Sequence, residues 1–329
     1  MIRTALLSRW HVHADDYADQ AENHPDVSIV TIWDDDEERG KAWAHDLGVS
    51  FEGNLPKVMA DPDIDAVIVT SSTDQHKDII LQAVRHKKHV FTEKVLALTK
   101  EDHEEIENSI ERNHIKFMIS LPRLTSSYHL YTRKIIEEHK LGDINMLRCR
   151  VAHNGAVPTE KHPEGWLPER FFDKHTCGGG SLVDLGAHPI YMANSLAGSP
   201  IAVSARLHSM MKRGVDDHST AIVEYDSGVL AVLESSFVSS GSPFQLEIYG
   251  TKGTIMVEGD QLKIKSQSHG MEEWTYPEPP SPLSSPFDQW VEDILNDIPP
   301  SITIKDAEAL TVVNEAAAKS HLKGQRITI

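Results

Sequence analysis

Short hydrophobic runs alternate with amphipathic stretches over roughly the first 120 residues of the chain. The apolar runs are Thr4–Leu7, Val27–Trp33, Ala66–Thr70, Val90–Thr92 and Phe117–Ser120. Unbroken runs rich in β-branched residues are typical of strands that are buried on both faces of a parallel sheet. The stretches between them have the spacing of helices: Ala14–His24, Glu37–Leu47, Gln75–His86 and Lys100–Asn113. This alternation predicts a doubly wound, Rossmann-like α/β domain.

The pattern changes after Leu121, where consecutive strands replace the alternation. Strands are predicted over Met146–Ala152, Ala202–His208, Thr220–Tyr225, Val229–Phe237, Phe244–Tyr249 and Thr254–Val257. Helices are predicted over Ser127–His139, Leu182–Leu196, Phe287–Asn296 and Lys305–Leu322. Because links of hairpin length join several of the strands, we expect an α+β domain with a largely antiparallel, open sheet. The predicted domains are residues 1–122 and 123–329.

The composition fits a two-domain globular protein and excludes several classes. A length of 329 residues exceeds what a single hydrophobic core usually spans. With 32 Lys and Arg against 50 Asp and Glu, the net charge of −18 argues against binding to nucleic acid or to an anionic membrane. Two cysteines and no signal-peptide pattern predict a reduced, cytoplasmic setting. The 19 histidines form no HExxH motif and no tight Cys/His set, so no metal site is expected.

The loop after the first predicted strand is the first candidate binding segment. It contains Ser8, Arg9, Trp10 and His11 but lacks the glycine fingerprint of dinucleotide-binding folds, and the first glycine of the chain is Gly40. Glycine lets the backbone approach a pyrophosphate closely. Ser8 and the helix start near His11 can still supply N–H donors, and Arg9 and Trp10 can pair with or stack on a cofactor. The alternatives are surface positions for Arg9 and Trp10, and a Rossmann fold that has lost its nucleotide.

An acidic run follows the second predicted strand. Asp34 stands at the end of that strand, where a carboxylate meets the ribose hydroxyls of an adenosine and repels a 2′-phosphate. The run therefore favours NAD over NADP as the cofactor. Residues 35–38 have an alternative interpretation as a solvated helix N-terminus, which acidic side chains stabilise through the helix dipole.

Two further motifs carry candidate chemistry. Glu93 and Lys94 follow the fifth predicted strand, at the edge of an open α/β sheet where ligands bind. Asp184 and His188 follow a triple glycine, and their i, i+4 spacing places them on one face of the helix predicted there. The alternative for this second pair is a capping arrangement at the start of the helix.

Together these segments resemble the Gfo/Idh/MocA family, named after glucose–fructose oxidoreductase and inositol dehydrogenase. The resemblance rests on WHVHADDY, DDDEERGKAWAHDLGV, DAVIVTSSTDQH, HVFTEKVLALTKEDHEEI, GGGSLVDLGAHPIYM and LEIYGTKGTIMVEG, which follow the order of the family over nearly the full chain. Two departures stand out. Val95 replaces the proline of the family's Glu-Lys-Pro motif, and the glycine fingerprint is absent.

The resemblance implies an NAD(P)-dependent oxidoreductase that acts on a secondary alcohol of a sugar, cyclitol or related polyol. It implies an NAD-binding first domain, and a second domain for substrate binding and oligomerisation. It also maps the catalytic residues to Lys94, Asp184 and His188. A nicotinamide accepts the hydride, His188 takes the hydroxyl proton, and Lys94 stabilises charge on the substrate oxygen. Asp184 orients His188 or holds a neighbouring hydroxyl.

Weaker candidates lie at strand ends and in the long loop before the triple glycine. The expected cofactor contacts are Thr70, Ser71, Ser72, His76, Glu93 and Lys94. The expected substrate contacts are Lys94, Arg123, His153, Trp166, Asp184 and His188. The expected partners are a neutral polyol and further copies of the chain in a homodimer or homotetramer. Two other functions remain open: a non-catalytic nucleotide-binding regulator, and an NAD-retaining glycoside hydrolase or lyase.

Overall fold

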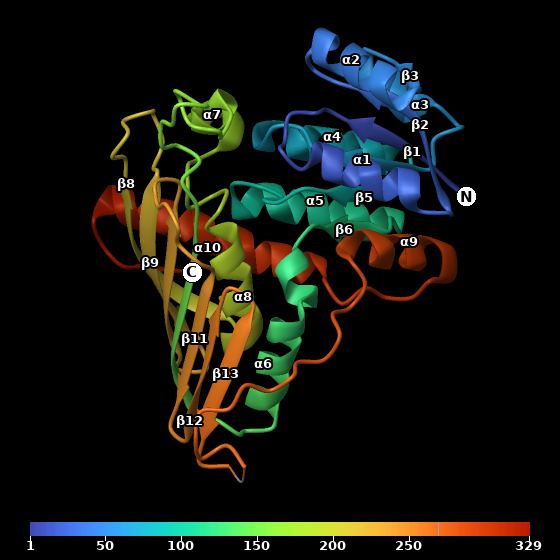
Figure 1. Cartoon of the computed structure of the whole chain (residues 1–329). Helices are drawn as coiled ribbons and strands as arrows, with labels where there is room; N and C mark the ends of the chain where they lie inside the picture. The colour runs from blue at the N-terminus through green and yellow to red at the C-terminus, as the bar shows by residue number, and fades with distance from the viewer. Residues whose placement is uncertain (269) are drawn as a thin grey trace. The chain divides into compact units, whose positions relative to one another are not determined.

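The computed structural model describes residues 1–268 and 270–329, and the chain divides into two compact units. Unit 1 comprises Met1–Ser120 and Ser284–Ile304, and unit 2 comprises Leu121–Leu283 and Lys305–Ile329. Figure 1 shows the helices and strands of the chain. Among the described residues, no helix combines the length and the apolar character that a membrane crossing requires.

Unit 1 is built on a six-stranded parallel sheet with the strand order β3-β2-β1-β4-β5-β6. The strands are β1 (Ile2–Leu7), β2 (Val27–Trp33), β3 (Ser50–Phe51), β4 (Ala66–Val69), β5 (His89–Thr92) and β6 (Phe117–Ile119). Every side chain of β4 is buried, as the unbroken apolar run predicts. The sheet order and the alternation with helices confirm the Rossmann-like fold.

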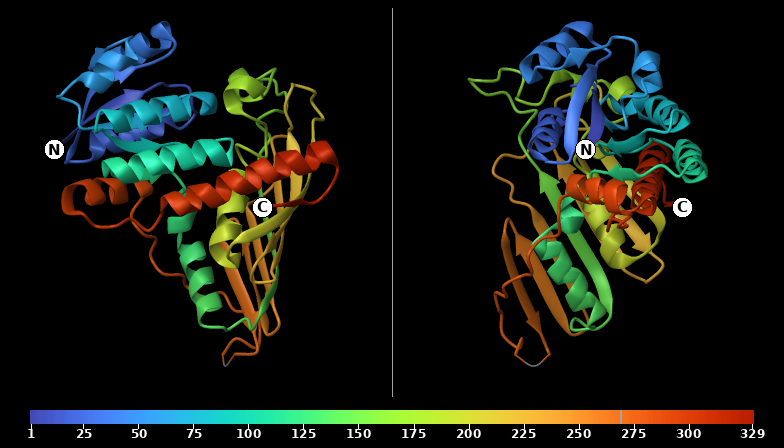
Figure 2. Two further views of the ribbon diagram at one scale, coloured as in Figure 1. Left: turned by 180° about the vertical axis from the view of Figure 1, so that it is seen from behind. Right: turned by 90° about the vertical axis from the view of Figure 1, so that its right-hand side faces the viewer.

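The helices of unit 1 cover both faces of this sheet (Figure 2). They are α1 (Ala14–Asn23), α2 (Glu37–Leu47), α3 (Leu55–Ala60), α4 (His76–Arg85) and α5 (Lys100–Asn113), with a short 3₁₀ turn at Thr73–Gln75. Helix α2 begins where the Asp36 side chain accepts N–H groups of the first turn, and it ends at Gly48 in a left-handed conformation. Strand β3 and helix α3 were not predicted, because two and six residues are too short to show a period.

Unit 1 also takes in a helix from near the end of the chain, α9 (Pro286–Asn296), which the predicted boundary at residue 122 assigns to the other domain. Phe287 and Trp290 of α9 pack on Phe91 of β5, with ring centroids 5.5 and 5.6 Å apart. Lys116 pairs with Asp293 at 2.8 Å. Aromatic packing between segments far apart in sequence therefore makes α9 part of unit 1.

Unit 2 contains an eight-stranded sheet with the order β13-β12-β11-β7-β10-β9-β8-β14. Its strands are β7 (Ile144–Ala152), β8 (Pro200–His208), β9 (His218–Tyr225), β10 (Leu230–Ser236), β11 (Gln245–Gly250), β12 (Gly253–Glu258), β13 (Gln261–Ser266) and β14 (Ile327–Thr328). Neighbours are antiparallel except for the parallel pair β7 and β10. The largely antiparallel sheet confirms the predicted α+β class.

The helices of unit 2 are α6 (Ser127–Glu137), α7 (Lys174–Cys177), α8 (Ala187–Ala197) and α10 (Ile304–Lys323), with 3₁₀ turns at Pro122–Thr125 and Glu169–Phe172. Helix α8 packs against β7 and β10, and α6 packs against α8. The prediction that this helix begins at Leu182 is wrong, because residues 181–186 form successive turns. Asp184 therefore precedes α8, and the i, i+4 argument that placed it on one helical face with His188 does not hold.

Candidate functional site

The strand order of unit 1 reverses between β1 and β4, which creates the crevice where ligands bind in open α/β sheets. The loop after β1 and the loop after β4 are bonded to each other at this edge. The Thr70 hydroxyl donates to the Ser8 carbonyl at 2.5 Å, and the His11 N–H donates to the Thr70 carbonyl at 3.0 Å. The structure therefore brings together Ser8, His11 and Thr70, three of the expected cofactor contacts.

Ser8 adopts a left-handed backbone conformation, with φ of 73°, at the position where a dinucleotide-binding loop usually has its first glycine. Its N–H donates to the Trp33 carbonyl at 2.7 Å. Its hydroxyl donates to the carboxylates of Asp35 at 3.0 Å and Asp34 at 3.3 Å. Hydrogen bonds thus hold a conformation that glycine adopts without strain.

Asp34 is buried at the end of β2, and its carboxylate is fully engaged. It accepts the N–H groups of Arg9 at 2.8 Å and Asp36 at 2.9 Å, and the Arg39 guanidinium meets both of its oxygens at 2.9 and 2.5 Å. Burial opposes ionisation, but the hydrogen bonds from Arg39, Arg9 and Asp36 outweigh it and lower the pKa of Asp34. The end of β2 therefore holds an ionised carboxylate and a guanidinium side by side.

Arg39 was missed in the sequence, although it stands five residues after Asp34. Its guanidinium also donates to Asp35 at 2.9 Å and to the Ser8 hydroxyl at 3.1 Å. Arg9, which the sequence did single out, bonds Asp15 at 2.8 Å and Asp46 at 3.5 Å. Among the described contacts, the positive charge that joins the loop after β1 to Asp34 and Asp35 therefore comes from Arg39.

The loop after β4 holds three expected cofactor contacts, and all are buried. His76 has Nδ1 2.9 Å from the Val95 carbonyl and Nε2 3.2 Å from the Ser71 carbonyl, so it connects this loop to the one after β5. Burial lowers the pKa of His76 although both carbonyls oppose that shift, which keeps the ring neutral. The Ser72 hydroxyl is buried and has no hydrogen-bond partner among the described residues. Such an orphan is a group that a bound ligand can satisfy.

Glu93 and Lys94 follow β5 and are 2% and 6% exposed. The Glu93 carboxylate accepts the Tyr17 hydroxyl at 2.5 Å on one oxygen and the Lys94 N–H at 2.6 Å on the other. The Tyr17 hydroxyl also lies 2.7 Å from the Ser120 hydroxyl. Burial, and then the charge of Glu93, raise the pKa of Tyr17 well above its usual value, so the phenol stays protonated and donates. Tyr17 and Ser120 were not singled out in the sequence.

In unit 2, the segment before α8 depends on close backbone contacts. A Cβ on Gly180 would lie 1.8 Å from the Asp216 carbonyl oxygen, and one on Gly186 would lie 2.4 Å from the Leu182 carbonyl oxygen. The Asp216 carboxylate accepts the N–H groups of Gly180 and Leu182 at 3.0 and 2.9 Å. Burial raises the pKa of Asp216, although these hydrogen bonds oppose the shift. These contacts set the course of the turns that contain Asp184.

His188 lies in the first turn of α8, and its Nδ1 is 2.8 Å from the hydroxyl of Tyr191, three residues later. The same hydroxyl accepts the Arg123 N–H at 3.3 Å. Burial raises the pKa of Tyr191, so this side chain is a phenol at neutral pH. Since a phenol both donates and accepts, it can support His188 in either neutral tautomer. The i, i+3 spacing on a helix is the sequence signal that identifies Tyr191.

The remaining expected substrate contacts lie on the same unit as α8. The Arg123 guanidinium donates to the Tyr128 hydroxyl at 3.0 Å and lies 4.5 Å from the centre of the Phe244 ring. The His153 ring stacks on Phe237 with ring centroids 5.2 Å apart. The Trp166 ring also neighbours His153, with ring centroids 4.7 Å apart. Trp166 is 44% exposed, so it presents an aromatic surface to solvent.

Two family models match the chain. The one described as an oxidoreductase family with an NAD-binding Rossmann fold matches residues 10–121. The one described as the GFO/IDH/MocA C-terminal domain matches residues 129–256. The two matches fall on successive segments of the chain, one dominated by the parallel sheet and the other by the antiparallel sheet.

Several named proteins are similar in sequence. A 1,5-anhydro-D-fructose reductase of Ensifer adhaerens is 29% identical over 235 residues, covering 69% of this chain and 67% of the relative. A scyllo-inositol 2-dehydrogenase (NAD(+)) of Bacillus subtilis is 26% identical over 242 residues, covering 71% and 67%. A scyllo-inositol 2-dehydrogenase (NADP(+)) of the same organism is 25% identical over 295 residues, covering 85% and 84%.

Solved structures share the fold over the whole chain. A levoglucosan dehydrogenase in complex with NADH and levoglucosan matches with a TM-score of 0.84 at 20% identity, covering 100% of this chain and 99% of that one. An NAD-binding oxidoreductase from Klebsiella pneumoniae matches with a TM-score of 0.82 at 20% identity, with the same coverage. At this identity the likeness shows a common fold.

Proposed function

The chain belongs to the GFO/IDH/MocA oxidoreductase family, and from that premise we propose that it transfers a hydride between a nicotinamide cofactor and a secondary alcohol of a sugar, cyclitol or related polyol. The observation that carries the proposal is the pairing of His188 with the Tyr191 hydroxyl on α8, in a chain that also presents Lys94 after β5. Sequence relatives named as an anhydrofructose reductase and as inositol dehydrogenases support the substrate class.

Unit 1 fits a nicotinamide dinucleotide at two places. The paired Asp34 and Arg39 are proposed to meet the adenosine ribose, and the buried Ser72 hydroxyl offers a polar group with no partner among the described residues. When bound, the cofactor supplies the hydride acceptor. We favour NAD over NADP, because Asp34 and Asp35 already neutralise Arg39 and would repel a 2′-phosphate.

The proton of the reacting hydroxyl has a proposed acceptor in His188. An imidazole exchanges a proton near neutral pH, and the Tyr191 hydroxyl can match the hydrogen bond of Nδ1 before and after the transfer. Lys94 is proposed to donate a hydrogen bond to the substrate oxygen as negative charge develops there. Asp184 is proposed to orient His188 or to hold a neighbouring hydroxyl.

The proposed substrate is neutral. The net charge of −18 disfavours an anionic sugar phosphate. The exposed face of Trp166 offers a surface on which the C–H face of a sugar ring can pack, and Arg123 and His153 are proposed to add polar contacts. The functions of regulator and of NAD-retaining hydrolase or lyase are not favoured, because the similar named proteins are dehydrogenases and reductases.

Self-association is a further part of the proposal. The open face of the unit 2 sheet carries a ladder in which Arg148 pairs with Glu234 at 2.8 Å and with Glu247 at 3.7 Å. We propose that the part of this face formed by residues 203–257 makes the contact of a homodimer or homotetramer. A monomer in light scattering at micromolar concentration would reject this part.

The test of hydride transfer is formation of the reduced nicotinamide by the purified chain with a panel of polyols: NADH when NAD⁺ is offered and NADPH when NADP⁺ is offered. Substitution His188→Ala should lower the rate on the order of 10²–10⁴-fold, as expected for loss of a general base. His86→Ala serves as the matched control, because His86 is an exposed histidine at the end of α4. Equal rates for both variants would refute the role of His188.

A second variant separates positioning from folding. Tyr191→Phe keeps the ring packing but removes the hydroxyl that meets His188. We expect kcat to fall about 10-fold and the pH profile of kcat to shift, with KM nearly unchanged. A lower kcat with an unshifted pH profile would assign Tyr191 a purely structural role.

A further inference from the structure

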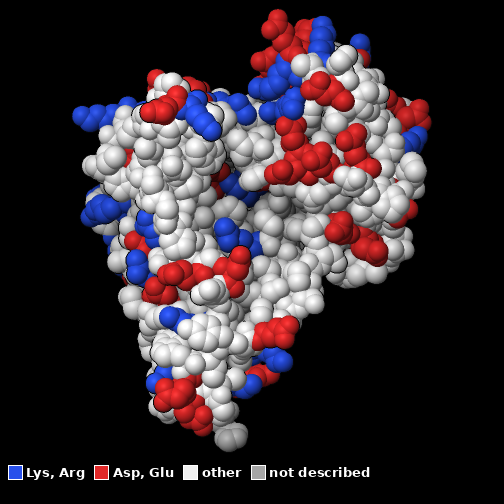
Figure 3. Space-filling view, in the orientation of Figure 1, with Lys and Arg blue, Asp and Glu red and all other residues white. Residues whose placement is uncertain are grey.

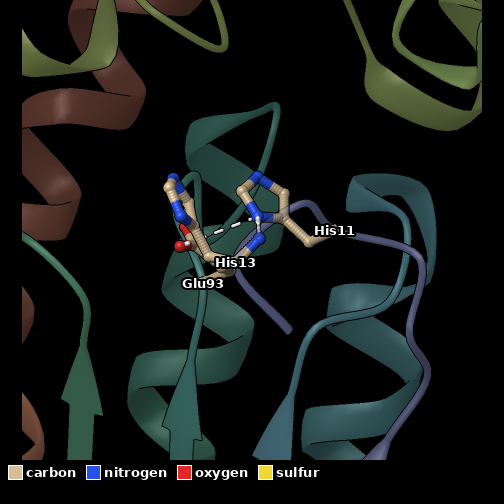
Figure 4. A group of neighbouring side chains, drawn as sticks. All are labelled: His11, His13 and Glu93. Carbon is tan, nitrogen blue, oxygen red and sulfur yellow. Dashed lines mark hydrogen bonds and ion pairs between the residues drawn. The ribbon is translucent and has the colours of Figure 1, made fainter. Parts of the chain in front are cut away.

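We propose that His11, His13 and Glu93 together bind a divalent transition-metal ion in unit 1. Figure 4 shows the three side chains gathered between the loop that precedes α1 and the loop that follows β5. One potential ligand atom from each residue lies within 4.8 Å of those of the other two, and His11 Nδ1 is 3.8 Å from a Glu93 oxygen. Ligands of a common zinc ion at ~2.1 Å lie about 3.4 Å apart, so the three side chains must move closer together to bind one ion. His11 Nδ1 accepts the His13 N–H at 3.2 Å, and that hydrogen bond must give way if Nδ1 is the ligand.

His13 is oriented as a metal ligand by a neighbouring carboxylate. Its Nδ1 lies 2.8 Å from an Asp16 oxygen, which fixes the ring and places the proton on Nδ1. The lone pair of Nε2 then becomes the ligand. Carboxylate–histidine–metal arrangements of this kind are common because the second hydrogen bond sets the tautomer and raises the basicity of the ligand nitrogen.

Glu93 is held in place from two directions. Tyr17 of α1 donates to one carboxylate oxygen, and the Lys94 N–H donates to the other. Each oxygen of an ionised carboxylate has a second lone pair, so these bonds leave room for a metal ion. A cation there would also offset the cost of keeping this carboxylate buried.

The surroundings favour a cation and provide access to the site. Acidic side chains gather over α1 on the face of unit 1 in Figure 3, and α1 carries Asp15 and Asp16 in its first turn. Their field raises the local concentration of cations. The side chains of His13 and Asp16 are 45% and 65% exposed, so an ion can enter from solvent past them.

The donor set selects the class of metal. Two imidazoles and one carboxylate suit Zn²⁺, Fe²⁺ and other first-row transition metals, whereas Mg²⁺ and Ca²⁺ prefer oxygen ligands throughout. Three protein ligands leave at least one coordination position open to water or to a ligand oxygen. The ion would add positive charge beside the loop after β1, which has no glycine and whose Arg9 is bound by Asp15 and Asp46.

The expectation of no metal site followed from the absence of a local motif. His11 and His13 are close in sequence, but the third ligand comes from the loop after β5. The parallel arrangement of β1, β4 and β5 in one sheet brings these segments to the same edge. A search for compact Cys/His patterns therefore cannot find this set.

The test is titration of the metal-free full-length chain with Zn²⁺ by calorimetry, repeated with Co²⁺ to follow its visible absorption bands. We expect about one tight Zn²⁺ per chain. His13→Ala and Glu93→Gln should weaken binding by at least 100-fold, and Asp16→Ala should weaken it on the order of 10–100-fold, because the hydrogen bond that orients the His13 ring is lost. His45→Ala should leave binding unchanged, since His45 is an exposed histidine beside Asp46 and outside the cluster.

Two results would overturn the metal site. One is the absence of stoichiometric Zn²⁺ binding by the wild-type chain. The other is binding of equal affinity and stoichiometry in His13→Ala, which would place the ion elsewhere among the 19 histidines. Because His13 is partly exposed, circular dichroism should show that this variant keeps its fold. The titration contains no nucleotide or polyol, so its outcome is independent of the proposed hydride transfer.

Discussion

The loop after β1 in unit 1 and the segment before α8 in unit 2 differ in whether they require glycine. Ser8 adopts the left-handed conformation without being glycine, and its hydroxyl and N–H bonds stabilise the loop. Gly180 and Gly186 face backbone oxygens so closely that no side chain fits. A left-handed φ costs a non-glycine residue only ~1–2 kcal/mol. A clash between a Cβ and a neighbouring backbone atom can be removed only by moving the backbone, which costs more. Glycine is therefore dispensable at position 8 and obligatory at positions 180 and 186.

The two segments are alike in one respect, because a buried carboxylate holds each of them. Asp34 accepts two backbone N–H groups and the Arg39 guanidinium, whereas Asp216 accepts two backbone N–H groups and the Ser181 hydroxyl. Pairing with a cation lowers the pKa of the first carboxyl, and burial raises the pKa of the second. Each carboxylate therefore holds a backbone segment in place, but the surroundings of the two shift their pKa values in opposite directions.

The largest expected effect comes from Gly180→Ala. The new methyl group would lie 1.8 Å from the Asp216 carbonyl oxygen, so the backbone must move. We expect the free energy of unfolding to fall by at least ~3 kcal/mol in urea denaturation. Gly228→Ala is the control, because its Cβ would meet nothing within 4 Å and only its left-handed φ of 87° is strained. Equal losses in both variants would show that the close backbone contact does not make glycine obligatory at position 180.

The next effect concerns the sign of the pH dependence. The lowered pKa of Asp34 means that its stabilising contribution is present above the ordinary aspartate pKa of about 3.9 and is lost as pH falls through the folded-state value. The raised pKa of Asp216 means that protonation favours the folded state, so its contribution grows as pH falls through that value. Asp34→Asn should therefore lessen acid destabilisation, and Asp216→Asn should increase it.

Chemical denaturation of the wild type, Asp34→Asn and Asp216→Asn from pH 7 to pH 3 measures this difference in pH dependence. The quantity compared is the slope of the unfolding free energy against pH, since each substitution also shifts the absolute stability. Slopes that change in the same direction in both variants would show that the two carboxyls do not differ in the proposed way.

The smallest effect separates strain from hydrogen bonding at Ser8. Ser8→Ala keeps the strained φ and loses the hydroxyl bonds to Asp34 and Asp35, so it should cost about 1 kcal/mol of unfolding free energy. Ser8→Gly loses the same bonds but relieves the strain, so its stability should lie closer to the wild-type value. If Ser8→Gly is the less stable of the two, the strain at this left-handed position is smaller than the extra conformational entropy that glycine loses on folding.

Much of the fold follows from local patterns. Strand β2 and helices α2 and α5 match the predicted boundaries, because an unbroken apolar run, an Asp36 cap and a Thr99 cap are local signals. Helix α8 begins later than predicted, because contacts of Gly180 and Gly186 with distant or preceding backbone impose turns first. Helix α9 joins unit 1 through aromatic packing that a helical period cannot reveal.

The alternation of strands and helices, the family, and the candidate residues Lys94, Asp184 and His188 could all be predicted from local features, since hydrophobic period and short motifs are local properties of the chain. The partners of these side chains became visible in the folded chain. It paired Arg39 with Asp34, placed Tyr191 against His188, and gathered His11, His13 and Glu93 at one sheet edge. Such pairings depend on which strands are neighbours in a sheet and on how closely backbone segments approach each other. These are distances in space, and the spacing of residues along the chain does not reveal them.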